Sequence, residues 1–417
     1  MSEYYDELDT QEPGSRTRAQ FAKLAQHLQS AVQNCPGLAQ HLAGIDLSAI
    51  KCEQSLQTLP VLRKSALMQA QTQHPPFGGF VNESGLDGCR VFMSPGPVWE
   101  PQVGVVDPWE AARALHAAGF RRGDRVHNTF SYHVTPGGFM LDEGARALGC
   151  SVFPSGTSPT EQQIQTMQTF AASAFVGTPD YLYNVLSKAD ELMVYLPALK
   201  RAMVSGGPLF PAMREDFNQR GIAVQQCYAT ADLGVIAYET ATGSIVHPGM
   251  LLNEHLIVEL VKPGSGDPVE AGEVGEIVVT RLHPDYPLVR FATGDLSAFI
   301  DEPSPCGRTA KRIKGWMGRA DQRTKVRGMF VDPTQIQALR KAHPEVSALR
   351  LVVTRAKNKD VMTLQINIAD SVGAESVNIE GLSDSLKSLT GLSGNIQRLD
   401  VPLPNDGVVV DDQRDTE

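Results

Sequence analysis

The chain has 417 residues, of which 42% are hydrophobic, enough to bury sizeable cores and to argue against wholesale disorder. This length exceeds one ordinary core and suits a large domain followed by a small one. The net charge of −10 argues against nucleic acid as a partner, because nucleic-acid binding relies on lysine and arginine to displace counterions. A nucleotide stays compatible with this charge, since a few backbone amides can hold phosphates.

The composition also predicts a cytoplasmic protein without a membrane partner. The first residues, Met-Ser-Glu-Tyr-Tyr-Asp-Glu, are acidic and unlike a signal peptide, and no run approaches the ~18 apolar residues of a membrane span. The six cysteines are scattered without a CxxC pair, so the sequence predicts reduced thiols and no cysteine metal site.

In chain order, residues 1–75 form a helical lead-in, with apolar residues at helical spacing over 17–32. Strand and helix patterns alternate over 90–207. A helix is predicted at 160–170, a buried strand at 174–177, and a strand over 199–204 that runs into a glycine turn. Such alternation is typical of a parallel sheet flanked by helices, which binds ligands beyond the carboxyl ends of its strands.

Residues 249–300 change to short strands, at 256–261 and 275–280, and predict a β-rich subdomain. Beyond it, a helix at 333–343, strands at 349–354 and 361–368 and a helix at 379–389 predict a small α+β unit. The fold class is therefore α/β. An N-terminal domain at 1–318 has helix-flanked sheets and the β-rich subdomain, and a small C-terminal domain follows at 319–417.

One local motif reads Tyr-Pro-Leu-Val-Arg-Phe-Ala-Thr-Gly-Asp and ends at Asp295. A carboxylate after Thr-Gly at the end of a strand can accept both ribose hydroxyls of a nucleotide, although an aspartate capping its own turn would leave the same pattern. A Gly-rich charged link follows, with Arg319, Asp321, Arg327 and Gly328. It suits ribose or phosphate binding at a hinge, or a plain polar linker.

Further upstream, Tyr228-Ala229-Thr230-Ala-Asp232 follows an apolar strand. The aromatic ring can stack on a base while the carboxylate holds Mg²⁺ near phosphates; a buried tyrosine and a helix-capping aspartate are the alternative. The preceding Ser205-Gly206-Gly207 offers a bare backbone against which a flat ring can lie.

The order of these motifs resembles the adenylate-forming (AMP-binding) superfamily, and Cys306-Gly-Arg-Thr before Gly-Arg-x-Asp resembles its phenylacetate–CoA ligase branch. Further matching segments lie at 156–162, 178–181 and 272–280, so the resemblance covers most of the chain from about residue 90 onward. It implies a large ATP-binding domain with a small mobile C-terminal domain. It also implies that ATP first joins a small-molecule carboxylic acid to AMP, after which the small domain rotates to admit CoA.

The same resemblance implies roles for individual residues. Asp232 and Arg319 would be catalytic, with Asp232 facing Mg²⁺, and Asp321 would sit at the hinge. The residues implied to bind nucleotide are Ser94, Gly96, Ser205, Gly206, Gly207, Tyr228, Ala229, Thr230, Asp295 and Arg319. The acyl pocket would contain Tyr132, His133, Gly137 and Gly138, and the CoA region Arg327 and Gly328.

Three departures from the branch stand out. The phosphate-loop segment at 92–101 keeps Ser94 and Gly96 but contains prolines, which remove amide donors. The Ser-Glu pair of the branch reads Ala231-Asp232. Where the family has a Gly-Lys turn aimed at the acyl carboxylate and the α-phosphate, this chain has Val408, and Lys387 is its last lysine. Losing such a cation costs about 3–4 kcal/mol, or ~10²–10³ in rate.

The sequence therefore predicts an ATP-dependent acid–CoA ligase for an aromatic or arylacetic acid such as phenylacetate, with ATP, CoA and Mg²⁺ as its cofactors. A homodimer is compatible with the sequence. The alternative is a catalytically impaired homologue that binds nucleotide or acyl-CoA as a sensor or partner subunit, and Val408 favours it. A third reading is an acyl-adenylate donor to a carrier protein.

Overall fold

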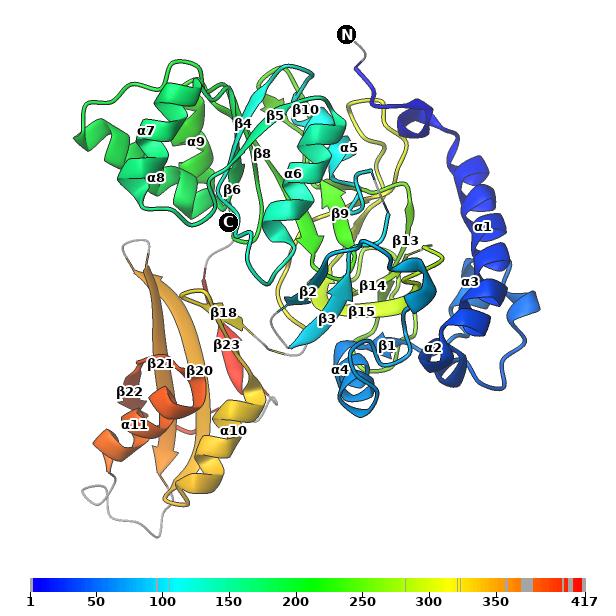
Figure 1. Ribbon diagram of the computed structural model, residues 1–417. Coiled ribbons are helices and arrows are strands. Elements are labelled where there is room, and N and C mark those ends of the chain that lie inside the picture. The colour runs from blue at the N-terminus through cyan, green and yellow to red at the C-terminus, as the bar shows by residue number, and fades with distance from the viewer. Residues whose placement is uncertain are drawn as a thin grey trace. The chain divides into compact units, whose positions relative to one another are not determined.

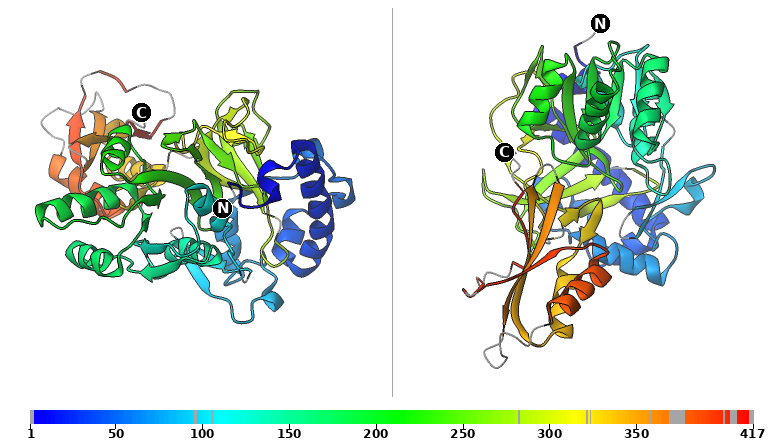
Figure 2. Two further views of the ribbon diagram at one scale, coloured as in Figure 1. Left: turned by 90° about the horizontal axis from the view of Figure 1, so that it is seen from above. Right: turned by 90° about the vertical axis from the view of Figure 1, so that its left-hand side faces the viewer.

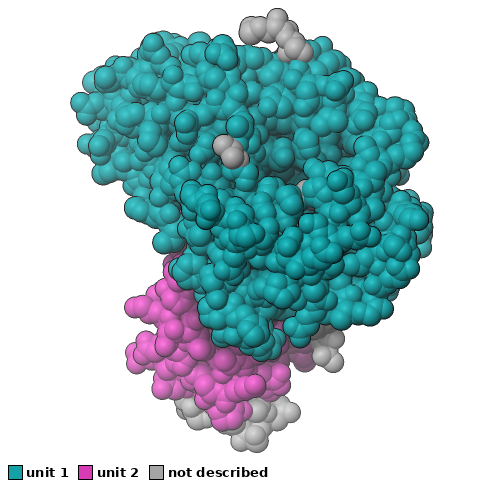
Figure 3. Space-filling model, turned by 45° about the vertical axis from the view of Figure 1, so that its right-hand side comes forward, with its two compact units in different colours: residues 1–293, 297–316 teal, residues 294–296, 317–417 magenta. Residues whose placement is uncertain are grey.

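The computed structural model describes residues 3–94, 97–104, 106–281, 283–320, 322, 324–356, 359–368, 378–399, 401–403 and 408–414. The chain divides into two compact units, which Figure 3 colours separately. The large unit comprises residues 1–293 and 297–316, and the small unit comprises residues 294–296 and 317–417. Segment 294–296 thus groups with the small unit, although its strand β15 (Leu288–Ser297) begins in the large one.

The main sheet of the large unit has the strand order β16-β17-β12-β9-β8-β7-β6-β4-β5 in the described part of the chain (Figure 1). Its parallel half consists of β4 (Arg125–Asn128), β5 (Ser151–Pro154), β6 (Ala174–Gly177), β7 (Arg201–Val204) and β8 (Ala223–Thr230). Strand β6 is buried along its whole length, as expected for a strand covered on both faces of the sheet.

Helices cover both faces of this parallel half, because successive strand residues point to opposite sides (Figures 1 and 2). Ala174 and Val176 pack with α5 and α6, whereas Phe175 between them packs with the other helices. The first face carries α5 (Ala111–Ala117) and α6 (Gly137–Ala147), and the second carries α7 (Thr160–Phe170), α8 (Pro179–Glu191) and α9 (Pro211–Gln219).

The antiparallel half of the sheet continues from β8 through β9 (Gly234–Tyr238), β12 (Met250–Leu252), β17 (Arg312–Ile313) and β16 (Phe299–Ile300). Two hairpins accompany it: β2 (Val91–Ser94) with β3 (Val98–Pro101), and β10 (Ala241–Thr242) with β11 (Ile245–Val246). The turn between β8 and β9 requires Gly234, whose φ is 84° and whose added Cβ would lie 2.5 Å from the carbonyl oxygen of Trp109.

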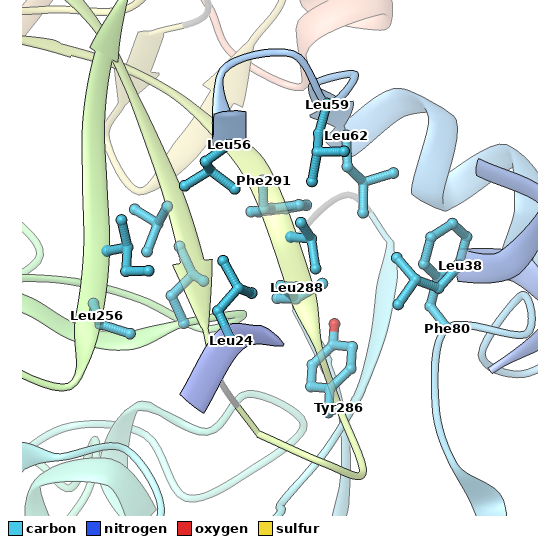
Figure 4. Close-up of a cluster of buried hydrophobic side chains, with 14 of the residues drawn as sticks. Leu24, Leu38, Leu56, Leu59, Leu62, Phe80, Leu256, Tyr286, Leu288 and Phe291 are labelled. Atoms are coloured by element: carbon cyan, nitrogen blue, oxygen red, sulfur yellow. The ribbon is translucent and has the colours of Figure 1, made fainter. Parts of the chain in front are cut away.

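The N-terminal helices close the large unit over a second sheet of order β1-β15-β14-β13. This part contains α1 (Pro13–Asn34), α2 (Pro36–His41), η2 (Leu47–Ala49), α3 (Glu53–Leu56), β1 (Leu62–Arg63), α4 (Lys64–Gln73), η3 (Glu83–Gly85), β13 (Leu256–Val261) and β14 (Gly275–Arg281). Apolar residues at helical spacing on α1, including Leu24 and Leu28, pack onto Leu256, Leu288 and their neighbours (Figure 4). Residues far apart in sequence therefore share one core.

The small unit has its own core on a sheet of order β22-β21-β20-β23. Its elements are β18 (Thr324–Val326), β19 (Met329–Val331), α10 (Pro333–Ala342), β20 (Val346–Ala356), β21 (Lys359–Ile368), α11 (Ile379–Thr390), β22 (Asn395–Arg398) and β23 (Val410–Asp412). Strand β23 comes from the C-terminal segment and pairs in parallel with β20.

The predicted α/β class is confirmed. Predicted elements also match: α7 has the predicted bounds, and α10, α11, β20 and β21 agree within three residues at each end. One expectation is wrong, because Asp295 does not end its strand. Strand β15 runs on to Ser297, since the amide of Leu296 donates to the carbonyl of Gly318 and the amide of Met317 donates to the carbonyl of Leu296.

A buried ionic cluster ties the N-terminal segment to the large unit. Asp9, in η1 (Glu7–Thr10), is fully enclosed, bonds to Arg113 of α5, and accepts from Nε of Arg308 at 3.0 Å. Arg113 also pairs with Asp6 at 2.7 Å and with Glu254 at 3.2 Å. Enclosed ions must be paired, so removal of one partner leaves an uncompensated charge.

We predict that Asp9→Ala lowers the unfolding free energy of the large unit by about 3–5 kcal/mol. Tryptophan fluorescence during urea unfolding measures this, because all three tryptophans, at 99, 109 and 316, belong to the large unit. Asp190→Ala is the matched control, since Asp190 pairs with Arg220 at 2.8 Å but is 61% exposed, and such pairs contribute about 0–1 kcal/mol. Equal losses of unfolding free energy in Asp9→Ala and Asp190→Ala would show that the Asp9 cluster does not hold the N-terminal segment in place.

Candidate active site

The turns after the parallel strands meet at one edge of the main sheet, because carboxyl ends of parallel strands lie side by side. In the predicted Ser-Gly-Gly turn at 205–207, the hydroxyl of Ser205 donates to the carbonyl of Cys227 in β8 at 2.8 Å. Gly206 has a φ of 74°, and its added Cβ would lie 3.8 Å from the ring of Phe130. The structure thus places this turn beside the one that follows β4.

The predicted acyl-pocket residues lie in that second turn and in the first turn of α6, which starts at Gly137. The hydroxyl of Tyr132 donates to Asp142 at 2.8 Å and accepts from Asn128 at 2.7 Å. Burial, followed by the nearby charge of Asp142, raises the pKa of Tyr132, so its hydroxyl stays neutral. The position of Gly138 requires glycine, because an added Cβ would lie 2.6 Å from a backbone oxygen.

Aromatic rings pack beside the ring of Tyr132. Phe139 meets Tyr132 edge-on with ring centres 5.1 Å apart, Phe92 lies 5.4 Å from Phe139, and the guanidinium of Arg90 lies 4.7 Å above the Phe139 ring. His133, by contrast, is exposed. The structure therefore brings Tyr132 and Gly138 into one bonded group and leaves His133 at the surface.

The segment predicted as a phosphate loop forms the β2–β3 hairpin. Ser94 lies at the end of β2, and its hydroxyl donates to Oε1 of Glu100 at 2.8 Å. Within the hairpin, the amide of Met93 bonds to the carbonyl of Val134 and that of Trp99 to the side chain of Gln71. Two amides of the hairpin are therefore already engaged. Gly96 lies outside the described residues.

Asp232 lies in the turn between β8 and β9 rather than at a helix start, and it is 2% exposed. Lys64, the first residue of α4, approaches its Oδ2 at 3.0 Å. Arg281 is buried and donates to the carbonyls of Asp232 and Pro108 at 3.2 and 2.7 Å. Burial lowers the pKa of Arg281, and these backbone acceptors hold its guanidinium in place.

The residues around Asp232 fit a magnesium ion. Oδ1 of Asp232 has no hydrogen-bond donor in the described part of the chain, and Mg²⁺ prefers such hard oxygen ligands. The predicted neighbours Tyr228, Ala229 and Thr230 are all half-buried in β8. Their roles beside the base stay predictions.

Asp295 and Arg319, both in the small unit, lie together. Nη1 of Arg319 is 2.9 Å from Oδ1 of Asp295, and the two residues form a β-bridge. Gly294, with a φ of 75°, must be glycine, because an added Cβ would lie 2.5 Å from the guanidinium. The Thr-Gly-Asp sequence therefore shapes a carboxylate–guanidinium pair. Asp321, the predicted hinge, lies outside the described residues.

Two turns of the small unit carry the remaining predicted residues. Arg327 and Gly328, with φ of 47° and 86°, turn the β18–β19 hairpin, and Arg327 donates to the carbonyl of Ser393 at 2.7 Å. Val408 precedes two amides, of Val409 and Val410, that donate to Oε1 of Gln322 at 2.6 and 3.3 Å. The residues that follow Val408 are thus bonded to the segment next to the predicted hinge.

Sequence reasoning missed three charged residues around Asp232, namely Lys64, Glu100 and Arg281. Lys64 lies 168 positions from its partner, in a segment expected only to be helical. Glu100 lies in the segment predicted as a phosphate loop, where the pattern assigns it no role. A lysine directly after a short strand and a lone arginine at the end of β14 carry no local signal, so only the tertiary structure reveals this group.

Three comparisons with known proteins bear on this arrangement. The family model described as AMP-binding enzyme matches residues 130–283. A phenylacetate-coenzyme A ligase of Thermus thermophilus is 30% identical over 82% of this chain and 79% of its own length. The chain belongs to the phenylacetate–coenzyme A ligase family. The enzyme of this name from Aromatoleum evansii is 28% identical over 90% of this chain and 88% of its own length.

Among solved structures, a 2-hydroxyisobutyryl-CoA ligase bound to its acyl-AMP and CoA has a TM-score of 0.80 at 25% identity. That match covers 100% of this chain and 93% of the other chain. Membership of the phenylacetate–coenzyme A ligase family confirms the predicted acid–thiol ligase class. Among the described residues, no helix is both long and apolar enough to cross a membrane.

We predict that Asp295→Ala weakens AMP binding by about 1.5–3 kcal/mol, because a charged acceptor for the ribose hydroxyls is lost. Titration calorimetry with AMP measures this, and circular dichroism checks the fold. Asp384→Ala, an exposed aspartate of α11 in the same unit, is the control. Unchanged AMP affinity in folded Asp295→Ala would contradict the ribose assignment.

Proposed function

We propose that this protein is an ATP-dependent acid–CoA ligase that forms an acyl-adenylate and then a thioester. In the first step a carboxylate oxygen of the acid attacks the α-phosphorus of ATP and pyrophosphate leaves. In the second step the CoA thiol attacks the acyl carbon, AMP leaves, and the thiol proton passes to solvent. The observation that carries the proposal is the retained buried Asp232 in the turn after β8 of a chain of this family.

The residues of this chain divide the work between binding and orientation. Asp295 accepts the ribose hydroxyls while Arg319 holds its carboxylate. The turn at 205–207 and Tyr228 border the adenine, and Arg327 with Gly328 faces CoA. A divalent cation at Asp232 would neutralise the phosphate charge of the nucleotide.

For the acid, we propose an aromatic or arylacetic compound such as phenylacetate. Supporting this, Phe92, Phe139 and Tyr132 cluster at the start of α6, and flat rings bind well in such surroundings. The curated relatives named for phenylacetate point the same way. One structural relative is named for 2-hydroxyisobutyrate, an aliphatic acid, so the test must include both kinds.

We expect pyrophosphate release with phenylacetate and ATP, and thioester formation when CoA is added. Phenylacetate, benzoate and 2-hydroxyisobutyrate are compared, each with and without CoA. Release with an acid but no thioester would indicate another acceptor, such as a carrier protein. No release with any acid, while AMP or acyl-CoA still binds, would instead identify an impaired homologue that acts as a sensor or partner subunit.

The C-terminal turn gives a sharper prediction. Val408 brings no charge to the acyl carboxylate and the α-phosphate, so adenylation is slow, whereas attack of CoA on a supplied acyl-adenylate is nearly normal. Val408→Lys should restore part of a factor of ~10²–10³ in adenylation. A single-turnover assay of acyl-adenylate formation measures this.

Val401→Lys is the control for the Val408→Lys experiment, because Val401 is 66% exposed in the same unit. Equal gains in both variants would show that added charge, not its position, matters. Fast adenylation by the unaltered protein would mean that another cation supplies the positive charge at the acyl carboxylate and the α-phosphate. Lys64 beside Asp232 is the candidate.

A further inference from the structure

Two carboxyl groups from distant segments meet inside the large unit. Glu100, on β3, and Asp232, after β8, are each 2% exposed and lie within hydrogen-bond range of each other. Oε1 of Glu100 accepts from Ser94, and Oδ2 of Asp232 faces Lys64. The second oxygen of each carboxyl group is Oε2 of Glu100 and Oδ1 of Asp232.

These two remaining oxygens receive no hydrogen from any N–H or O–H group of the described residues. The buried hydroxyl of Tyr286 also lacks a partner in the described part of the chain. A buried acceptor without a donor is costly, so something must satisfy this group.

We propose that Glu100 joins Asp232 as a second carboxylate ligand of the divalent cation that accompanies the nucleotide. The proposal rests on the proposed function, which supplies ATP as the partner of that cation. Mg²⁺ in nucleotide sites is held by one or two carboxylates together with substrate phosphates, so this oxygen pair has the required chemistry.

The surroundings of the pair leave room for a cation. Lys64 meets Asp232 through Oδ2, and Arg281 is held by the carbonyls of Asp232 and Pro108, so neither positive side chain bonds Oε2 of Glu100 or Oδ1 of Asp232. The side chain of Lys64 is 27% exposed, so this side of the group reaches solvent. A cation bound there would bring positive charge to a hairpin whose prolines and engaged amides leave it few donors for phosphate.

The hairpin itself presents Glu100. Antiparallel pairing sets Glu100 opposite Phe92 and Ser94 opposite Val98, which places Ser94 and Glu100 within bonding distance on one face. Gln71 holds the strand between them, because it bonds both the amide and the carbonyl of Trp99. The carboxyl of Glu100 is therefore fixed in position before a ligand arrives.

The test uses Mn²⁺ as the probe, with the full chain and the non-hydrolysable nucleotide α,β-methylene-ATP. Electron paramagnetic resonance of free Mn²⁺ measures its affinity for the protein–nucleotide complex. The variants are Glu100→Gln and Asp232→Asn, with Glu302→Gln, an exposed glutamate, as control. Glutamine keeps the shape of Glu100 and its bond to Ser94, and tryptophan fluorescence on heating checks that each variant folds.

We expect each of the two variants to weaken Mn²⁺ binding about tenfold or more, with no change in the control. Unaltered Mn²⁺ affinity in Glu100→Gln would overturn the proposal. Tighter nucleotide binding by Glu100→Gln with unaltered Mn²⁺ affinity would also overturn the proposal, because Glu100 would then obstruct the phosphate site. Absence of protein-bound Mn²⁺ in the unaltered complex would overturn it as well.

Pyrophosphate release separates this proposal from the proposed function. If pyrophosphate release by Glu100→Gln needs about tenfold more Mg²⁺ than release by the unaltered protein, both the cation-site proposal and the ligase activity stand. If Glu100→Gln releases pyrophosphate at the usual Mg²⁺ concentration, the ligand assignment fails and the ligase activity stands. If no acid supports release while Mn²⁺ binding still depends on Glu100, the cation site stands and the activity fails.

Discussion

The ion pair between half-buried Lys64 and buried Asp232 joins parts of the large unit that the chain order keeps far apart. It connects the N-terminal helices to the turn after β8, across 168 positions. Because a charge that loses its partner inside a protein is strongly destabilising, each partner fixes the segment of the other. Arg290 likewise joins distant segments of the large unit. It is buried and bonds to Glu259 and to the backbone carbonyls of residues 57, 59 and 266.

The N-terminal segments are thus structural parts of the large unit. Asp9 reaches Arg113 and Arg308, α1 packs on the second sheet, and Lys64 begins the helix that follows β1. The candidate site depends on this packing, since the position of Lys64 is set by α4 and that of Asp232 by the β8–β9 turn. The Lys64–Asp232 ion pair therefore links the packing of the N-terminal helices to the position of the candidate site at the sheet edge.

Local patterns predicted much of the fold. Helices such as α7 and α11, and strands such as β6 and β21, follow from periodicity and from the residues that end them. The resemblance placed Asp295 and Arg319 together among the nucleotide-binding residues, whereas their direct pairing is seen only in the structure. Contacts between distant segments could not be predicted in this way. Nothing in the sequence of the hairpin at 91–101 says that Glu100 folds against Asp232, because that contact depends on the register of the hairpin and on the end of β8.

The distribution of positive charge is the point at which this chain differs from the family pattern. At the C-terminal turn, Val408 provides none, and the amides beside it are engaged by Gln322. Beside Asp232, by contrast, Lys64 and Arg281 are held by side-chain and backbone oxygens of the large unit itself. Lys64 and Arg281 therefore belong to the packing of the large unit, whereas a lysine at 408 would belong to the small unit. The positive charge that the structure shows beside Asp232 is thus part of the same contacts that hold the β8–β9 turn in place.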